Sequence, residues 1–173
     1  MKTIPSFQID HNILKRGIYI SRIDDDITTY DIRMREPNKE TVMTITLKEQ
    51  QVPALQAARE YTAMHTIEHL FATYVRNTEF GDNIIYFGPM GCRTGFYFLT
   101  RSLSDNYSIK LIKEAFQFIA DYWGVIPGAS PKECGNCLDH NLPQAKEESK
   151  AFLEVIKDWT KEDLKYPKAE DEE

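Results

Sequence analysis

The chain reads Gly17-Ile18-Tyr19-Ile20-Ser21-Arg22-Ile23 at the point that decides its fold, and it continues after Asp24-Asp25-Asp26 with Ile27-Thr28-Thr29-Tyr30-Asp31-Ile32-Arg33-Met34-Arg35. Both segments are rich in β-branched and aromatic residues, which favour extended backbone, and the acidic triplet between them is typical of a turn. The sequence therefore predicts an antiparallel β-hairpin that ends near Pro37-Asn38.

The rest of the chain adds strands and helices in an irregular order. Two further strands are expected at 83–88 and 94–100, on either side of the tight loop 89–93. Apolar periodicity predicts helices from about Pro53 to Asn77, over 109–123 with Gly124 as the stop, and over 142–159. Because strands and helices do not alternate as a parallel sheet requires, we expect an α+β fold, with a small antiparallel sheet of about four strands packed against helices. We expect a single domain over 1–167 and a disordered acidic tail over 168–173.

Composition narrows the class of partner. The chain has 173 residues, with 21 Lys+Arg against 27 Asp+Glu and a net charge of −6. An acidic surface argues against nucleic acid or an anionic membrane as partner and favours a small-molecule ligand. The apolar runs are far shorter than the roughly 18–20 residues of a membrane span. Three cysteines, an odd and small number, fit a reducing compartment, so we expect a cytoplasmic protein whose cysteines serve metal binding or catalysis.

The main chemical signal is His65-Thr66-Ile67-Glu68-His69 on the first predicted helix. Two histidines at i and i+4 lie about 40° apart around a helix, so both imidazoles can reach one cation. Glu68 lies beside that stripe and can touch a ligand of the metal without binding the metal itself. The pattern is the inverted zinc-protease motif, so an inverzincin-type metalloprotease is one alternative. Two hydrogen-bonded histidines on a core helix are the other.

A third ligand is offered by the segment Glu133-Cys134-Gly135-Asn136-Cys137. If both cysteines bind, the site is a closed Cys2His2 centre, as in a non-catalytic zinc module. If one binds, a fourth position stays open for water or substrate, and the spacing alone leaves this choice open. Cys92 lies in a glycine-flanked loop where Arg93 could stabilise a thiolate, although a lone cysteine is more often a small buried apolar side chain.

These residues also carry a family resemblance. Several separated blocks, in order along most of the chain, resemble S-ribosylhomocysteine lyase, the enzyme family whose product becomes autoinducer-2. The blocks are Ser6-Phe7-Gln8-Ile9-Asp10-His11-Asn12, Tyr30-Asp31-Ile32-Arg33 with Pro37-Asn38-Lys39, His65-Thr66-Ile67-Glu68-His69-Leu70, Pro89-Met90-Gly91-Cys92-Arg93-Thr94-Gly95, and Cys134-Gly135 followed by His140.

The resemblance implies an activity: cleavage of S-ribosyl-L-homocysteine to L-homocysteine and 4,5-dihydroxy-2,3-pentanedione, by carbonyl migration through enediolates and β-elimination. The product serves quorum sensing or the methyl cycle. The resemblance also implies a homodimer with a small antiparallel sheet and one divalent metal per subunit, natively Fe(II), with Zn(II) or Co(II) possible.

Roles for individual residues follow from the same resemblance. It implies that His65, His69 and Cys134 bind the metal, and that Cys92 and Glu68 are the acid/base pair. Ser6, His11 and Arg33 fall where the family contacts substrate, partly across the dimer interface. Cys137 falls where the family has no ligand, which favours the open site, and Tyr86 stands where some members have an acidic residue.

Overall fold

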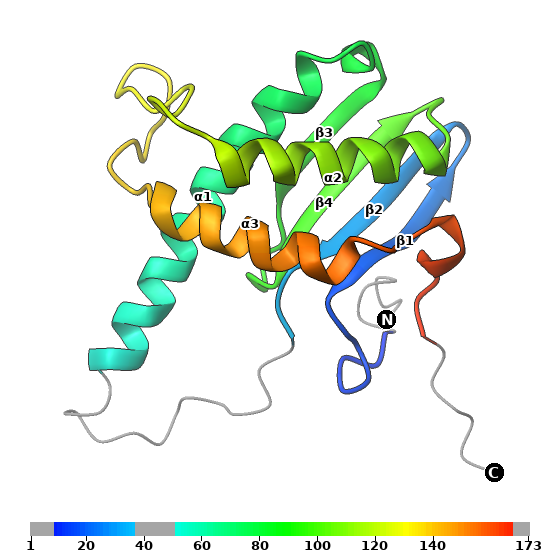
Figure 1. Cartoon of the computed structure of the whole chain (residues 1–173), viewed down its shortest axis with the longest axis horizontal. Coiled ribbons are helices and arrows are strands. Elements are labelled where there is room, and N and C mark those ends of the chain that lie inside the picture. Colours follow the sequence, from blue (N-terminus) through cyan, green and yellow to red (C-terminus); the bar gives the residue numbers. More distant parts are fainter. Residues whose placement is uncertain (1–8, 37–50, 168–173) are drawn as a thin grey trace, which may run out of the picture.

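A four-stranded antiparallel sheet forms the base of the molecule (Figure 1). The computed structural model describes residues 9–36 and 51–167. The strands are β1 (Gly17–Asp24), β2 (Ile27–Arg33), β3 (Ile84–Pro89) and β4 (Gly95–Arg101), in the order β1-β2-β4-β3. The predicted hairpin and the two later strands are therefore confirmed. Asp25 takes the left-handed conformation, at φ 51°, that the short turn between β1 and β2 requires.

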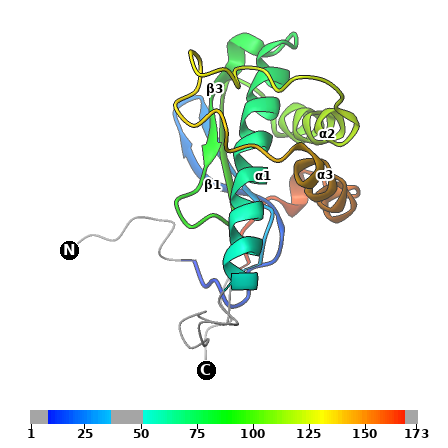
Figure 2. The same ribbon diagram turned by 90° about the vertical axis from the view of Figure 1, so that its left-hand side faces the viewer.

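The helices of the described chain cover one face of this sheet, which Figure 2 shows from the side. They are α1 (Gln51–Arg76), α2 (Asp105–Asp121) and α3 (Leu142–Ile156), with short 3-10 turns at Gly81–Asn83 and Lys161–Asp163. The α+β expectation is thus confirmed. No helix in the described ranges combines the length and apolarity that crossing a membrane needs.

Strand periodicity separates two faces of the hairpin. Ile18 lies opposite Ile32, and Ile20 opposite Tyr30, and these side chains pack into the core beneath the helices. Tyr19 and Asp31, which lie opposite each other in the register, point to the other face because successive side chains of a strand alternate. Asp31 is nevertheless 0% exposed, so something other than the helices covers it.

Three predicted helix ends are wrong: both ends of α2 and the C-terminal end of α3. Capping explains the first of them. Helix α2 begins at Asp105 rather than 109, because the Ser104 side chain accepts the Tyr107 N–H as an N-cap. It ends at Asp121, which leaves Trp123 off the helix and 92% exposed.

Helix α3 ends at Ile156 instead of 159. Trp159 leaves the helical path and packs edge-on against Tyr19, with ring centroids 5.4 Å apart. From there the C-terminal segment runs beside the edge strand β1, where the backbone N–H of Ile20 donates to the Leu164 carbonyl at 2.8 Å (Figure 1). The single-domain boundaries stay a prediction, and the acidic tail lies outside the described residues.

Candidate metal centre and active site

His65 and His69 lie on the flank of helix α1, while its apolar face, including Ile67 and Leu70, is fully buried in the core. Both histidines are half-buried, and their rings are 4.7 Å apart and nearly perpendicular. The helical spacing i, i+4 therefore brings the two imidazoles together as the sequence predicts.

Backbone carbonyls fix the tautomers of these two histidines. His65 Nδ1 lies 2.7 Å from the Asp139 carbonyl, and His69 Nδ1 lies 2.8 Å from the Pro127 carbonyl. A carbonyl only accepts, so Nδ1 carries the proton in each ring and Nε2 keeps its lone pair. This second hydrogen bond is the arrangement that usually orients a metal-binding histidine.

Cys134 completes the trio from the loop that precedes helix α3. Its backbone N–H donates to the Ser130 carbonyl at 2.9 Å, and its sulfur lies 3.5 Å from His65 Nε2. Thiolate and imidazole groups that converge in this way form a donor set suited to zinc and other late divalent metals.

His140 is a fourth member that sequence reasoning left without a role. The ligand atoms of His65, His69, Cys134 and His140 all lie within 4.8 Å of one another. Burial, followed by the neighbouring His65 and His69, lowers the pKa of His140 to about 4, so its ring is neutral. The signal available in the sequence was its place six residues after Cys134, just before helix α3.

Ring geometry separates His140 from the other two histidines. Its ring is stacked on that of His65, with centroids 4.1 Å apart and planes 16° apart, whereas it stands at 82° to His69. The lone pair of an imidazole nitrogen lies in the ring plane, so one ion cannot lie in the planes of two stacked rings. In this arrangement His65 or His140 can bind the ion together with His69, but not both. Cys134 beside His65 favours His65.

The closed Cys2His2 alternative needs Cys137, which is not a member of this group. Cys137 is a half-buried free thiol in the same loop. Nor does the group found in the described residues contain the carboxylate that an inverzincin takes as its third ligand. The ring geometry favours a site in which three of these four residues bind the ion.

The four residues His65, His69, Cys134 and His140 are called the metal-binding group below. A cavity of about 380 Å³ opens next to this group. His65 and Glu68 border it from helix α1, Gly91 and Arg93 from the loop between β3 and β4, and Asn136 from the Cys134 loop. Glu68 also borders a neighbouring hollow that reaches His69. Glu68 is thus placed beside the metal-binding side chains without being one of them, as the sequence predicts.

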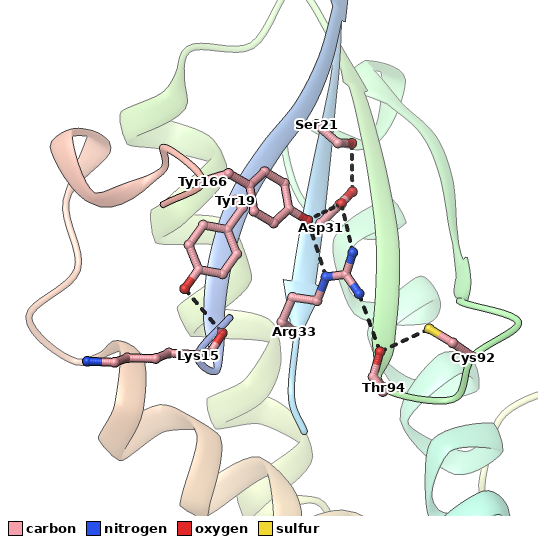
Figure 3. A network of polar contacts seen from close by, with 8 residues as sticks. All are labelled: Lys15, Tyr19, Ser21, Asp31, Arg33, Cys92, Thr94 and Tyr166. Atoms are coloured by element: carbon pink, nitrogen blue, oxygen red, sulfur yellow. Dashed lines mark hydrogen bonds and ion pairs between the residues drawn. The ribbon is translucent and has the colours of Figure 1, made fainter. Parts of the chain in front are cut away.

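Cys92 is exposed and lies between Gly91 and Arg93, two of the residues that line the cavity. It is therefore not a small buried apolar side chain. Its sulfur lies 3.0 Å from Thr94 Oγ1, and that oxygen lies 3.4 Å from Arg33 Nη1 (Figure 3). The cation connected to the Cys92 thiol in this way is Arg33. The sequence instead suggests Arg93, which follows Cys92 in the chain.

The three expected substrate contacts are distributed differently. Ser6 lies outside the described residues. His11 lies in the turn region before β1 and is not part of the metal-binding group. Arg33 is 2% exposed and is paired with Asp31, so direct contact with a substrate requires it to exchange one of its bonds. Tyr86, on β3, is 47% exposed and packs over Gly88.

Comparison with known proteins shows the family of this chain. The family model described as S-Ribosylhomocysteinase (LuxS) matches residues 4–163. An S-ribosylhomocysteine lyase of Phocaeicola vulgatus is 50% identical over 98% of this chain and 100% of its own length. Those of Porphyromonas gingivalis and Clostridium acetobutylicum are 49% and 40% identical, each over 96% of this chain and 99% of the relative. The chain belongs to the S-ribosylhomocysteinase (LuxS) family.

Proposed function

We propose that this chain is a metal-dependent carbon–sulfur lyase that converts S-ribosyl-L-homocysteine to L-homocysteine and 4,5-dihydroxy-2,3-pentanedione. One observation supports this most: two imidazole nitrogens and a thiolate sulfur converge beside a cavity that Glu68 and the Cys92 loop also border. Successive enolisations need a Lewis acid, a carboxylate and a base such as a thiolate. Glu68 borders this cavity directly, and Cys92 lies in the loop that borders it.

His65, His69 and Cys134 would hold the metal. Their fixed tautomers and mixed nitrogen–sulfur donor set fit a divalent late metal, and we propose Fe(II) as the native ion with Zn(II) or Co(II) as substitutes. The metal would supply Lewis-acid polarisation of a substrate carbonyl or hydroxyl. Three protein ligands leave a position for the substrate.

Cys92 and Glu68 would move the protons. After the ribose ring opens, the Cys92 sulfur takes a proton from the carbon next to the carbonyl and returns it to the former carbonyl carbon. Glu68 transfers the proton between the two oxygens. Two such steps carry the carbonyl to the position β to the thioether. Removal of the proton on the carbon between the carbonyl and the carbon that bears sulfur then expels homocysteine thiolate. That thiolate is protonated on sulfur.

We also propose that Ser6, His11 and Arg33 contact the substrate and that the active form is a homodimer. His11 is not a member of the cluster formed by His65, His69, Cys134 and His140. In a shared site, one protomer would supply His11 to the site of its partner. A cytoplasmic location suits the three cysteines, which are all free thiols.

The experiment that tests this function is thiol release from S-ribosylhomocysteine by protein purified without oxygen and loaded with Fe(II) or Co(II). We expect homocysteine from the loaded protein and none from the same protein after chelation. A fully metallated protein that releases no thiol would refute the lyase assignment. Peptide cleavage by that protein would favour the metalloprotease instead.

A further inference from the structure

A buried polar network lies on the sheet face away from the helices. The reaction proposed above gives no role to two of its members, Asp31 and Tyr166. Asp31 and Arg33 on β2 form an ion pair at 3.5 Å, with side chains 0% and 2% exposed. The third member is Tyr166, which comes from the C-terminal segment, 133 residues after Arg33 (Figure 3). Buried charges are costly unless they are paired and hydrogen-bonded, so the partners of this pair matter.

The C-terminal segment is anchored where it carries Tyr166. The Tyr166 ring stacks on that of Tyr19, with centroids 4.6 Å apart and planes 16° apart. Trp159 packs edge-on against Tyr19, and the Leu164 carbonyl accepts the Ile20 N–H. The Tyr166 hydroxyl is therefore held in place by packing that does not involve the hydroxyl itself.

Hydrogen-bond polarity gives this hydroxyl a defined task. Arg33 is only a donor and the Asp31 carboxylate is only an acceptor. Arg33 Nε donates to the Tyr166 oxygen at 3.2 Å, and the Tyr166 O–H donates to Asp31, which also accepts from Ser21 Oγ at 2.7 Å. Burial and the charge of Asp31 raise the pKa of Tyr166 far above 10, so its hydroxyl stays a proton donor.

The same polarity continues from Arg33 to Cys92. Arg33 Nη1 donates to Thr94 Oγ1 at 3.4 Å, so the Thr94 proton is free for the Cys92 sulfur at 3.0 Å. The Thr94 backbone cannot drift, because its carbonyl accepts the N–H groups of Met34 and Arg35, both at 3.0 Å. The bond from Arg33 thus uses one lone pair of the Thr94 oxygen and leaves the Thr94 proton available to the Cys92 sulfur.

We propose that Tyr166 is a positioning residue for the reaction: it holds the Arg33 guanidinium between Asp31 and Thr94, and so keeps the Thr94 hydroxyl pointed at the Cys92 sulfur. The proposal rests on the proposed function for its link to catalysis. Without the hydroxyl, Arg33 is drawn toward Asp31 and away from Thr94, since the 3.5 Å ion pair has room to shorten.

The test compares Tyr166→Phe with Tyr19→Phe in the metal-loaded protein. Both variants lose one hydroxyl and keep their stacked ring, but the Tyr19 hydroxyl donates to the Lys15 carbonyl, outside the network. The first readout is the rate at which iodoacetamide labels Cys92 at pH 7, measured on the Cys92 peptide by mass spectrometry. We expect Tyr166→Phe to label about tenfold more slowly, and its kcat to fall similarly, as loss of one hydrogen bond to a charged group allows. Tyr19→Phe should behave as wild type.

A double-mutant cycle with Thr94→Val sharpens the result. If Tyr166 acts through Thr94, the two substitutions together slow labelling no more than Thr94→Val alone, and Thr94→Ser keeps the wild-type rate. Wild-type labelling by Tyr166→Phe, or an equal loss in Tyr19→Phe, would overturn the proposal. The labelling readout needs no substrate, so absence of lyase activity in the wild-type protein would refute the proposed function and leave the positioning of Cys92 testable.

Discussion

The imidazole rings of His65 and His140 are stacked, with centroids 4.1 Å apart, and His140 Nε2 is buried without a hydrogen-bond partner in the described part of the chain. His140 Nδ1 lies 3.2 Å from Thr66 Oγ1, which holds the ring in place. If His65 binds the metal, His140 would be the neighbour against which the His65 ring packs. We therefore expect His140 to support the metal site without being a ligand.

Replacing His140 tests whether this residue binds the metal or only packs against a residue that does. His140→Ala is expected to bind one metal per subunit with about 10- to 100-fold lower affinity, the usual effect of losing a group that supports a ligand. His69→Ala removes a ligand and should bind no stoichiometric metal after dialysis. Competition with a chelator measures the affinity. If His140→Ala loses its metal as completely as His69→Ala does, His140 is a ligand and the stacking argument is wrong.

The two cysteines of the 134–137 segment form a matched pair. Cys134→Ser should lose the absorption of a Co(II)–thiolate bond together with most of the bound metal, because the sulfur next to His65 Nε2 is gone. Cys137→Ser should keep both, because Cys137 is outside the metal-binding group. The cobalt spectrum of each variant decides the matter. A weakened thiolate band in Cys137→Ser would revive the closed Cys2His2 centre.

Substitutions of Cys92 or Glu68 should lower lyase activity without loss of the bound metal. Cys92→Ala is expected to bind metal and substrate but to release homocysteine about 10²- to 10⁴-fold more slowly, the usual contribution of a positioned acid or base. Glu68→Gln removes the carboxylate from the cavity wall and should lose the later proton transfers by a similar factor. Metal analysis beside the thiol assay checks that the site stays loaded. Full turnover by either variant would remove that residue from the mechanism.

Local signals predicted the elements well, whereas side chains brought together from distant segments were missed. Runs of β-branched and aromatic residues on either side of an acidic turn identified the hairpin, and the i, i+4 spacing identified His65 and His69, because both patterns are contained in a few consecutive residues. The contact between Arg33 and Tyr166 joins residues 133 positions apart, and no local pattern predicts it. For the same reason the sequence suggested Arg93, the chain neighbour of Cys92, as the cation that acts on it.

Helix ends show the same limit. The apolar pattern continues through Trp159, so periodicity alone extended α3 to that residue. The helix stops earlier because Trp159 packs on Tyr19, on a strand that the helix pattern does not describe. An aromatic residue at the end of a periodic segment can thus serve the contact that follows the helix instead of the helix itself.

Buried Tyr30 predicts a loss of stability at alkaline pH. It is 0% exposed, and its O–H donates to Asp105 at 2.6 Å. Burial, followed by the hydrogen bond to Asp105, raises the pKa of Tyr30 well above its ordinary value of 10. In the unfolded chain the hydroxyl ionises near pH 10, whereas in the folded chain it does not. The stabilising contribution is therefore complete below pH 10 and is lost as the pH rises from 10 toward the folded pKa.

Tyr30→Phe tests this sign. The substitution should lower the free energy of unfolding at pH 8 by about 1–3 kcal/mol, because it leaves Asp105 without its buried donor. The difference from wild type should shrink above pH 10, since the variant has no Tyr30 proton to release on unfolding. Urea unfolding at pH 8, 9, 10 and 10.5 measures both proteins. A difference that stays constant or widens with pH would mean that Tyr30 ionises in the folded protein as readily as in the unfolded chain, and that its burial does not control the alkaline limit.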